Sequence, residues 1–181
     1  MTAPSDDQLM LMYRAGDPRA FEQLFDRYSG MVYNYARFAL SDPDAAEDVL
    51  QESFLSVADA AEGYEPRGFF KAWLMRIARN MCLNRLKSAT ARRQRVAALD
   101  LTAGDPPSRD QGPSEALETR ERMDRLRGLI AALPENQRDA LLLYAVEQMS
   151  YNEIAETMDA PVNTVKTLIH RARAALARSF E

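Results

Sequence analysis

Apolar residues recur every three or four positions along almost the whole chain, and residues typical of helix ends divide this repeat into segments. Such a repeat places apolar side chains on one face of an α-helix, whereas a half-buried strand would alternate apolar and polar residues. The first segments show the end signals. Ser5 followed by Gln8 forms a capping box, Gly16 can end that short helix, and Asp17 with Pro18 opens the next. The pattern therefore predicts an all-α fold.

Three further helices are expected in the N-terminal half. One extends over about 17–40, the next begins at 43 behind another Asp-Pro pair, and the last covers about 69–91, after a loop rich in Gly and Pro at 63–68. The inward side chains of the first two are expected to be Phe21, Leu24, Phe25, Tyr28, Val32 and Tyr35, and then Ala46, Val49, Leu50, Phe54 and Val57.

Residues 97–113 interrupt the helical repeat. The stretch contains three prolines and two glycines, and it has little apolar surface from which to build a core. We expect a flexible interdomain linker over residues 96–113. The chain then divides into two small helical domains, residues 1–95 and residues 114–181.

The C-terminal half ends in a short capped helix, a tight turn and a longer helix. Ser150 with Glu153 forms a second capping box, and residues 159–161 make the turn, after helices expected over about 114–133 and 134–148. This is the organisation of a helix-turn-helix, whose second helix enters the major groove of DNA. Helical hairpins also occur as plain packing elements, and the spacing alone leaves that alternative open. The inward stripe of the last helix is Val165, Ile169, Ala172 and Leu176, and its outward residues are Asn163, Thr164, Lys166, Thr167, His170, Arg171 and Arg173.

The charges are segregated along the chain. Residues 66–95 carry nine Lys and Arg and no Asp or Glu, although the protein as a whole has a formal charge of -4. A surface without carboxylates attracts a polyanion such as nucleic acid. Phe69, Phe70 and Trp73 lie in the same block, where they could stack on bases or form core. The alternative is a basic helix face solvated by water.

The composition excludes several classes of protein. A single cysteine and a single histidine exclude an internal disulfide and a zinc site built from these residues. No apolar run is long enough to span a bilayer, and the N-terminus lacks the pattern of a signal peptide. No phosphate-binding glycine loop or nucleophile-and-base constellation is present. We expect a cytoplasmic protein without membrane insertion, enzymatic activity, metal or cofactor.

Two sets of motifs are more specific than the spacing. The C-terminal half resembles the fourth conserved region of bacterial sigma factors in the runs LPENQR (133–138), SYNEIA (150–155), PVNTVKT (161–167) and HRAR (170–173). The N-terminal half resembles the second region of that family in the runs AEDVLQESF (46–54) and WLMRIARN (73–80). Two helical domains and a linker, without the family's other domains, match the extracytoplasmic function (ECF) subgroup of the sigma-70 family.

The resemblance implies a subunit that binds core RNA polymerase and directs promoter-specific initiation. In the family, the second-region domain binds polymerase through a polar face that corresponds to Asp48, Gln51 and Glu52 here. Asp48 and Glu52 are one helical turn apart and can present a joint anionic edge. A merely solvated acidic helix is the alternative.

The same domain, by resemblance, melts and reads the minus-ten promoter element. On a helical projection Phe70 and Leu74 fall on the core stripe, and Asn84 lies between that stripe and a polar flank. Trp73 could equally belong to the edge of the core. The loop at 62–68 resembles the family's specificity loop, which holds a flipped-out base. The expected DNA-facing residues of this domain are Arg67, Lys71, Trp73, Arg76, Asn80, Asn84 and Lys87.

The C-terminal domain, by the same resemblance, reads the minus-thirty-five element as duplex DNA through the outward residues of its last helix. An anti-sigma factor is a further expected partner. Two other functions compete with this one. A stand-alone helix-turn-helix regulator would bind duplex DNA without polymerase, but it has no need of the Asp48 surface. An all-helical interaction protein would use the basic block to bind an acidic partner, and the C-terminal motifs argue against it.

Overall fold

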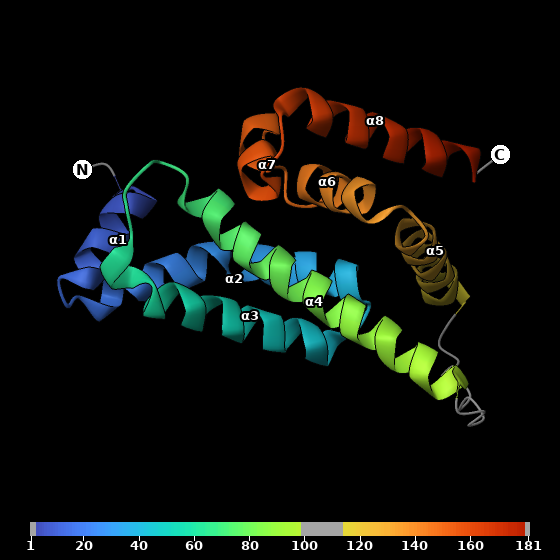
Figure 1. Cartoon of the computed structure of the whole chain (residues 1–181), viewed down its shortest axis with the longest axis horizontal. Helices are drawn as coiled ribbons and strands as arrows, with labels where there is room; N and C mark the ends of the chain where they lie inside the picture. The colour runs from blue at the N-terminus through green and yellow to red at the C-terminus, as the bar shows by residue number, and fades with distance from the viewer. Residues whose placement is uncertain (1–2, 99–113, 180–181) are drawn as a thin grey trace.

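The computed structural model describes residues 3–98 and 114–179, and this part of the chain is built from helices and loops without strands (Figure 1). The all-α prediction is confirmed. The N-terminal half holds α1 (Asp6–Arg14), α2 (Pro18–Leu40), α3 (Pro43–Asp59), a short 3₁₀ turn (Ala61–Gly63) and α4 (Phe70–Ala98). The C-terminal half holds α5 (Ser114–Ala131), α6 (Glu135–Ala145), α7 (Tyr151–Met158) and α8 (Val162–Arg178).

The helix ends follow the expected cap chemistry. The Ser5 and Ser150 side chains each accept a hydrogen bond from the backbone N–H three residues on, and the side chains of Gln8 and Glu153 return the contact. The Asp17 side chain caps α2, ahead of a proline at the first helical position. These caps supply acceptors that the free N–H groups of a first turn otherwise lack, so they fix where each helix begins.

Helix α4 is longer than expected, since it ends at Ala98 rather than near residue 91. Residues 96–98, which we assigned to the linker, are therefore helical. The rest of the predicted linker, residues 99–113, lies outside the described residues.

The N-terminal helices pack around one another, with α2 against α1 and α3, and α4 against α2 and α3. Leu24, Val32 and Tyr35 of α2 are fully buried, as the stripe predicts. The prediction for Phe25 is wrong: this side chain is 38% exposed, although its ring still contacts Phe54 at 4.8 Å between centroids. Phe25 directly follows Leu24, so its place 100° further round the helix turns it to the rim of the core.

The two halves of the chain also pack against each other. Helix α7 lies on α4, and α6 lies on α2, so that α8 stands on the outer side of the C-terminal helices (Figure 1). One hydrophobic cluster contains buried residues of both halves, while Leu133, Leu141 and Ala172 form a second, smaller cluster. The Thr157 hydroxyl of α7 also donates a buried hydrogen bond of 3.3 Å to the Ala72 carbonyl of α4. In the described chain the two helical halves are therefore in direct contact, through α7 on α4 and α6 on α2.

Candidate nucleic-acid interface

The basic residues at the start of α4 are engaged by the C-terminal half. Arg79 Nε lies 2.8 Å from Asp139 Oδ2 of α6, and the two side chains are only 12% and 1% exposed. Lys71 Nζ lies 3.3 Å from Glu153 Oε1 of α7. Arg76 donates to the backbone carbonyl of Glu156. Two of the predicted DNA-facing residues, Lys71 and Arg76, thus have partners in the C-terminal half.

Further along α4 the polar side chains are open to solvent. Asn80, Asn84 and Lys87 are all exposed. Arg85, which was not among the predicted DNA-facing residues, places its Nη2 2.8 Å from Glu52 Oε1 of α3. Residues 80–92 of α4 therefore offer an accessible polar surface, while the start of the helix is covered by α7, and Arg79 reaches α6.

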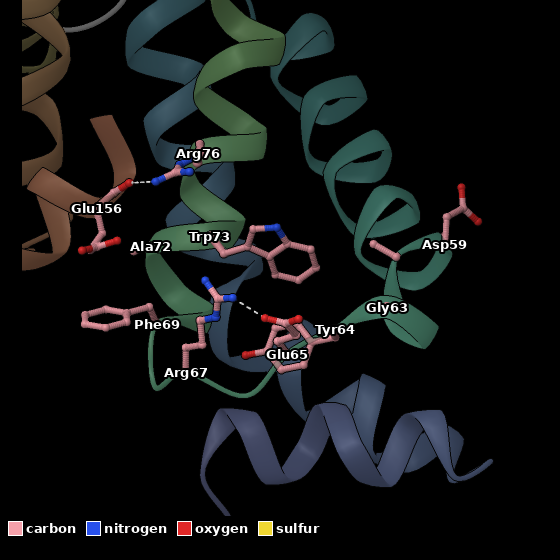
Figure 2. A pocket seen from close by; sticks show the side chains of 11 residues that line it. Asp59, Gly63, Tyr64, Glu65, Arg67, Phe69, Ala72, Trp73, Arg76 and Glu156 are labelled. Atoms are coloured by element: carbon pink, nitrogen blue, oxygen red, sulfur yellow. Dashed lines mark hydrogen bonds and ion pairs between the residues drawn. The ribbon is translucent and has the colours of Figure 1, made fainter. Parts of the chain in front are cut away.

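A cavity of about 660 Å³ lies beside the covered part of α4 (Figure 2). Trp73 forms one of its walls, half-buried and packed against Tyr64 and Phe70 with centroid distances of 5.2 and 5.9 Å. Arg67 pairs with Glu65 in the loop at its mouth. The cavity is lined by Asp59, Ala60, Gly63, Tyr64, Glu65, Arg67, Phe69, Ala72, Trp73, Arg76 and Glu156.

This cavity joins two groups of residues that the sequence suggested separately, the loop at 62–68 and the start of α4. Aromatic rings, two guanidinium groups and carboxylates around one cavity can stack on a base and hydrogen-bond its edge. Among the described residues, Glu156 is the one lining residue that belongs to the C-terminal half.

The predicted polymerase-binding residues lie together on the outer side of α3. Asp48, Gln51 and Glu52 are all exposed. Leu55, one turn further on, is 64% exposed and extends the same edge with an apolar side chain. Leu55 was not predicted from the sequence, although its place three and four positions after Glu52 and Gln51 was a usable signal.

Helix α8 has the two faces that the sequence predicted. Val165, Ile169 and Ala172 are buried against α6 and α7. The Thr167 hydroxyl donates back to the Asn163 carbonyl at 2.9 Å. All seven predicted outward residues are exposed: Asn163, Thr164, Lys166, Thr167, His170, Arg171 and Arg173.

Two acids of the contact between the halves have raised pKa values because they are buried. Burial raises the pKa of Asp139, while Arg79 and Arg138 act in the opposite direction. Burial raises the pKa of Glu147 to about 7, and Lys71 opposes this shift. Burial, and next the nearby Asp139 carboxylate, raises the pKa of Tyr35. Ionised Asp139 and Glu147 therefore lose solvation at the contact between the two halves, which disfavours their charged forms.

Metal-binding and membrane-spanning features are not found in the described part of the chain. Among its residues, no group of three or more His, Cys, Asp and Glu is placed to hold a metal ion. Within residues 3–98 and 114–179, no helix is both long and apolar enough to cross a membrane.

Comparison with known proteins identifies the family. Residues 24–92 match the family model for sigma-70 region 2, and residues 123–176 match the model for sigma-70 region 4. The RNA polymerase sigma-H factor of Pseudomonas aeruginosa is 33% identical, over 100% of this chain and 96% of that protein. The ECF RNA polymerase sigma-E factor of Haemophilus influenzae is 34% identical, over 93% of this chain and 92% of that protein.

The chain belongs to the ECF sigma factors of the sigma-70 family. Solved structures agree on the fold. CnrH, solved in complex with the cytosolic domain of CnrY, superposes with a TM-score of 0.75 at 24% identity, over 98% of this chain and 97% of that chain. The sigma factor RpoE of Bartonella quintana, solved with the anti-sigma factor NepR, gives 0.67 at 21% identity, over 87% and 94%.

Proposed function

We propose that this ECF sigma factor binds core RNA polymerase and directs it to promoters, with no catalytic activity of its own. The observation that carries the proposal is the match to an RNA polymerase sigma factor along the whole chain. The structure adds an exposed anionic edge on α3 and a helix-turn-helix formed by α7 and α8. A stand-alone helix-turn-helix regulator would leave the exposed anionic edge unexplained. We place its action in the cytoplasm, where the polymerase is.

The α3 edge is the proposed polymerase contact. Asp48, Gln51 and Glu52 supply acceptors for basic or amide groups, and Leu55 supplies an apolar anchor beside them. A mixed patch of this kind, an exposed apolar side chain within a polar rim, is typical of a protein–protein interface.

The cavity beside α4 is the proposed site for an unstacked base of the minus-ten element. Trp73 and Tyr64 offer ring faces for stacking, and Arg67 and Arg76 offer donors to a base edge or a phosphate. Asn80, Asn84 and Lys87 continue this surface along the helix and would follow the strand beyond that base.

The exposed face of α8 is the proposed contact with the minus-thirty-five duplex. Asn163 and Thr164 stand at the start of the helix, where side chains reach base edges, and the cations follow. Changing Lys166, Arg171 or Arg173 to Ala should weaken promoter binding. Removing a cation that binds a phosphate should reduce the salt slope of binding by about one unit. An unaltered slope would show that the residue does not bind a phosphate.

The closed arrangement of the two halves is proposed to be a resting form. In this form Lys71 pairs with Glu153, and Arg76 donates to the backbone carbonyl of Glu156. Glu156 also lines the cavity that is proposed to bind the base. Reading the minus-ten element would require α7 to leave α4. An anti-sigma factor is the proposed negative regulator. The proposal draws on the family and on one solved structure of similar fold, RpoE of Bartonella quintana with the anti-sigma factor NepR.

The proposed function is tested by reconstitution. The purified protein, mixed with bacterial core polymerase and a genomic promoter library, should select fragments and give run-off transcripts with defined starts. Polymerase without the protein is the control. Failure to associate with core, together with tight sequence-specific binding of duplex DNA by the protein alone, would favour the stand-alone regulator instead.

A further inference from the structure

Two tyrosines lie beneath the cationic face of α8, and neither has a role in the promoter contacts proposed for this chain. Tyr144 is the penultimate residue of α6, and Tyr151 is the first residue of α7. Their rings are stacked, with 5.2 Å between centroids and an angle of 11° between planes. Both side chains are half-buried and pack at the edge of the hydrophobic core.

Each of the two rings contacts one of the outward cations of α8. The guanidinium carbon of Arg173 lies 4.9 Å from the centroid of Tyr144. The Lys166 ammonium lies 5.7 Å from the centroid of Tyr151. Both distances are within the range of cation–π attraction. Two cations and two stacked rings therefore form one connected cluster that links α6, α7 and α8.

The spacing of the cations suits a shared target. Lys166 and Arg173 are seven positions apart, which is two turns of the helix and about 10 Å along its axis. Free Lys and Arg side chains sample many rotamers, and each loses entropy when it is fixed against a phosphate. A ring that already holds the cation reduces that loss.

We propose that Tyr144 and Tyr151 are positioning residues for duplex DNA, which hold Arg173 and Lys166 at a fixed spacing for two backbone phosphates. The inference rests on the proposed function, because it concerns the α8 face assigned there to the minus-thirty-five element. Hydrogen bonding from Tyr151, and then from Arg173, lowers the pKa of Tyr144, in keeping with a phenol that faces donors.

The test uses the free full-length chain, because α8 lies on the outer side of the C-terminal helices (Figure 1). It packs on α6 and α7, and its polar residues are exposed while the two halves are in contact. Binding to a fluorescein-labelled duplex of mixed sequence is followed by anisotropy at several NaCl concentrations. Tyr144→Leu should weaken binding about two- to fivefold, as expected for one cation–π contact at an exposed site. Tyr144→Phe, which keeps the ring, should retain most of the affinity.

Non-additivity distinguishes positioning from a structural role. In an Arg173→Ala background, Tyr144→Leu should have little further effect on affinity, because the cation that it positions is gone. Tyr33→Leu, in a half-buried tyrosine of α2, is the control and should leave binding unchanged, with thermal unfolding followed for every variant.

Additive effects of Tyr144→Leu and Arg173→Ala, or full affinity in Tyr144→Leu, would overturn the inference alone. Absence of salt-dependent duplex binding by the wild-type chain would overturn both the inference and the proposed duplex contact.

Discussion

At the scale of single residues, Glu147 makes stability depend on pH. Its side chain is 7% exposed, and burial raises its pKa from 4.5 to about 7. An acid with a raised pKa binds its proton more tightly in the folded state, so the free energy of unfolding falls as pH rises between these values. The decrease should be on the order of 2 kcal/mol, since one pKa unit is worth about 1.4 kcal/mol and screening by solvent offsets part of it.

Glu147→Gln should therefore flatten the pH dependence of stability and raise the midpoint of urea unfolding above pH 7. Urea titrations at several pH values between about 4.5 and 8 measure this, with the range set by the pKa shift. Glu135→Gln, in an exposed glutamate of α6, is the matched control and should keep the wild-type slope. If Glu147→Gln keeps the full slope, another group is responsible for it.

At the scale of elements, the edge of α3 carries the polymerase prediction. Asp48→Lys combined with Glu52→Lys should weaken core binding by more than about tenfold, because two cations replace two acceptors in one interface. Leu55→Ala should weaken it less, because it removes only apolar surface. Fluorescence titration with core polymerase measures both. The charge-matched control is Glu22→Lys with Asp26→Lys, two exposed acids one turn apart on α2. Equal weakening in control and test would refute the α3 contact.

Helix ends and helix faces are the parts of this fold that the sequence predicts well. Ser150, Glu153 and Asp17 act on backbone groups within three residues, so their effect can be read locally. Phe25 shows where such local prediction fails. It has the right spacing for the core, yet its exposure depends on which helices surround α2 and where their contact ends. Leu55 was missed although it lies outside the predicted inward stripe of α3 and one turn after Gln51 and Glu52, a spacing that places it on their exposed edge.

At the scale of the whole molecule, the contact between the halves could not be predicted from the sequence. Arg79 and Asp139 lie 60 positions apart, with the predicted linker between them. Each looks like an ordinary surface charge, and only the packing of α6 and α7 on α2 and α4 brings them together. The candidate DNA surface was predicted in its composition, whereas its partial coverage by the C-terminal half was not.

This contact leads to a final prediction, that Asp139→Asn opens the chain. The substitution leaves the largely buried Arg79 without its charged partner, and breaking one side of a buried pair costs about 3–5 kcal/mol. Because that cost falls on the contact between the halves, α7 should separate from α4 while the helices remain. Hydrogen exchange should become faster at residues 70–79 and 151–158, and exchange in α3 should stay at the wild-type level.

Asp26→Asn provides the matched control, since it removes the same charge from an exposed site on α2. The opened Asp139→Asn protein should also bind a labelled single-stranded oligonucleotide more tightly than the Asp26→Asn protein, because Lys71, Arg76 and the cavity beside Trp73 are freed. Faster exchange without tighter binding would separate the two ideas: the contact would hold the halves together, but it would not be what keeps DNA away from α4.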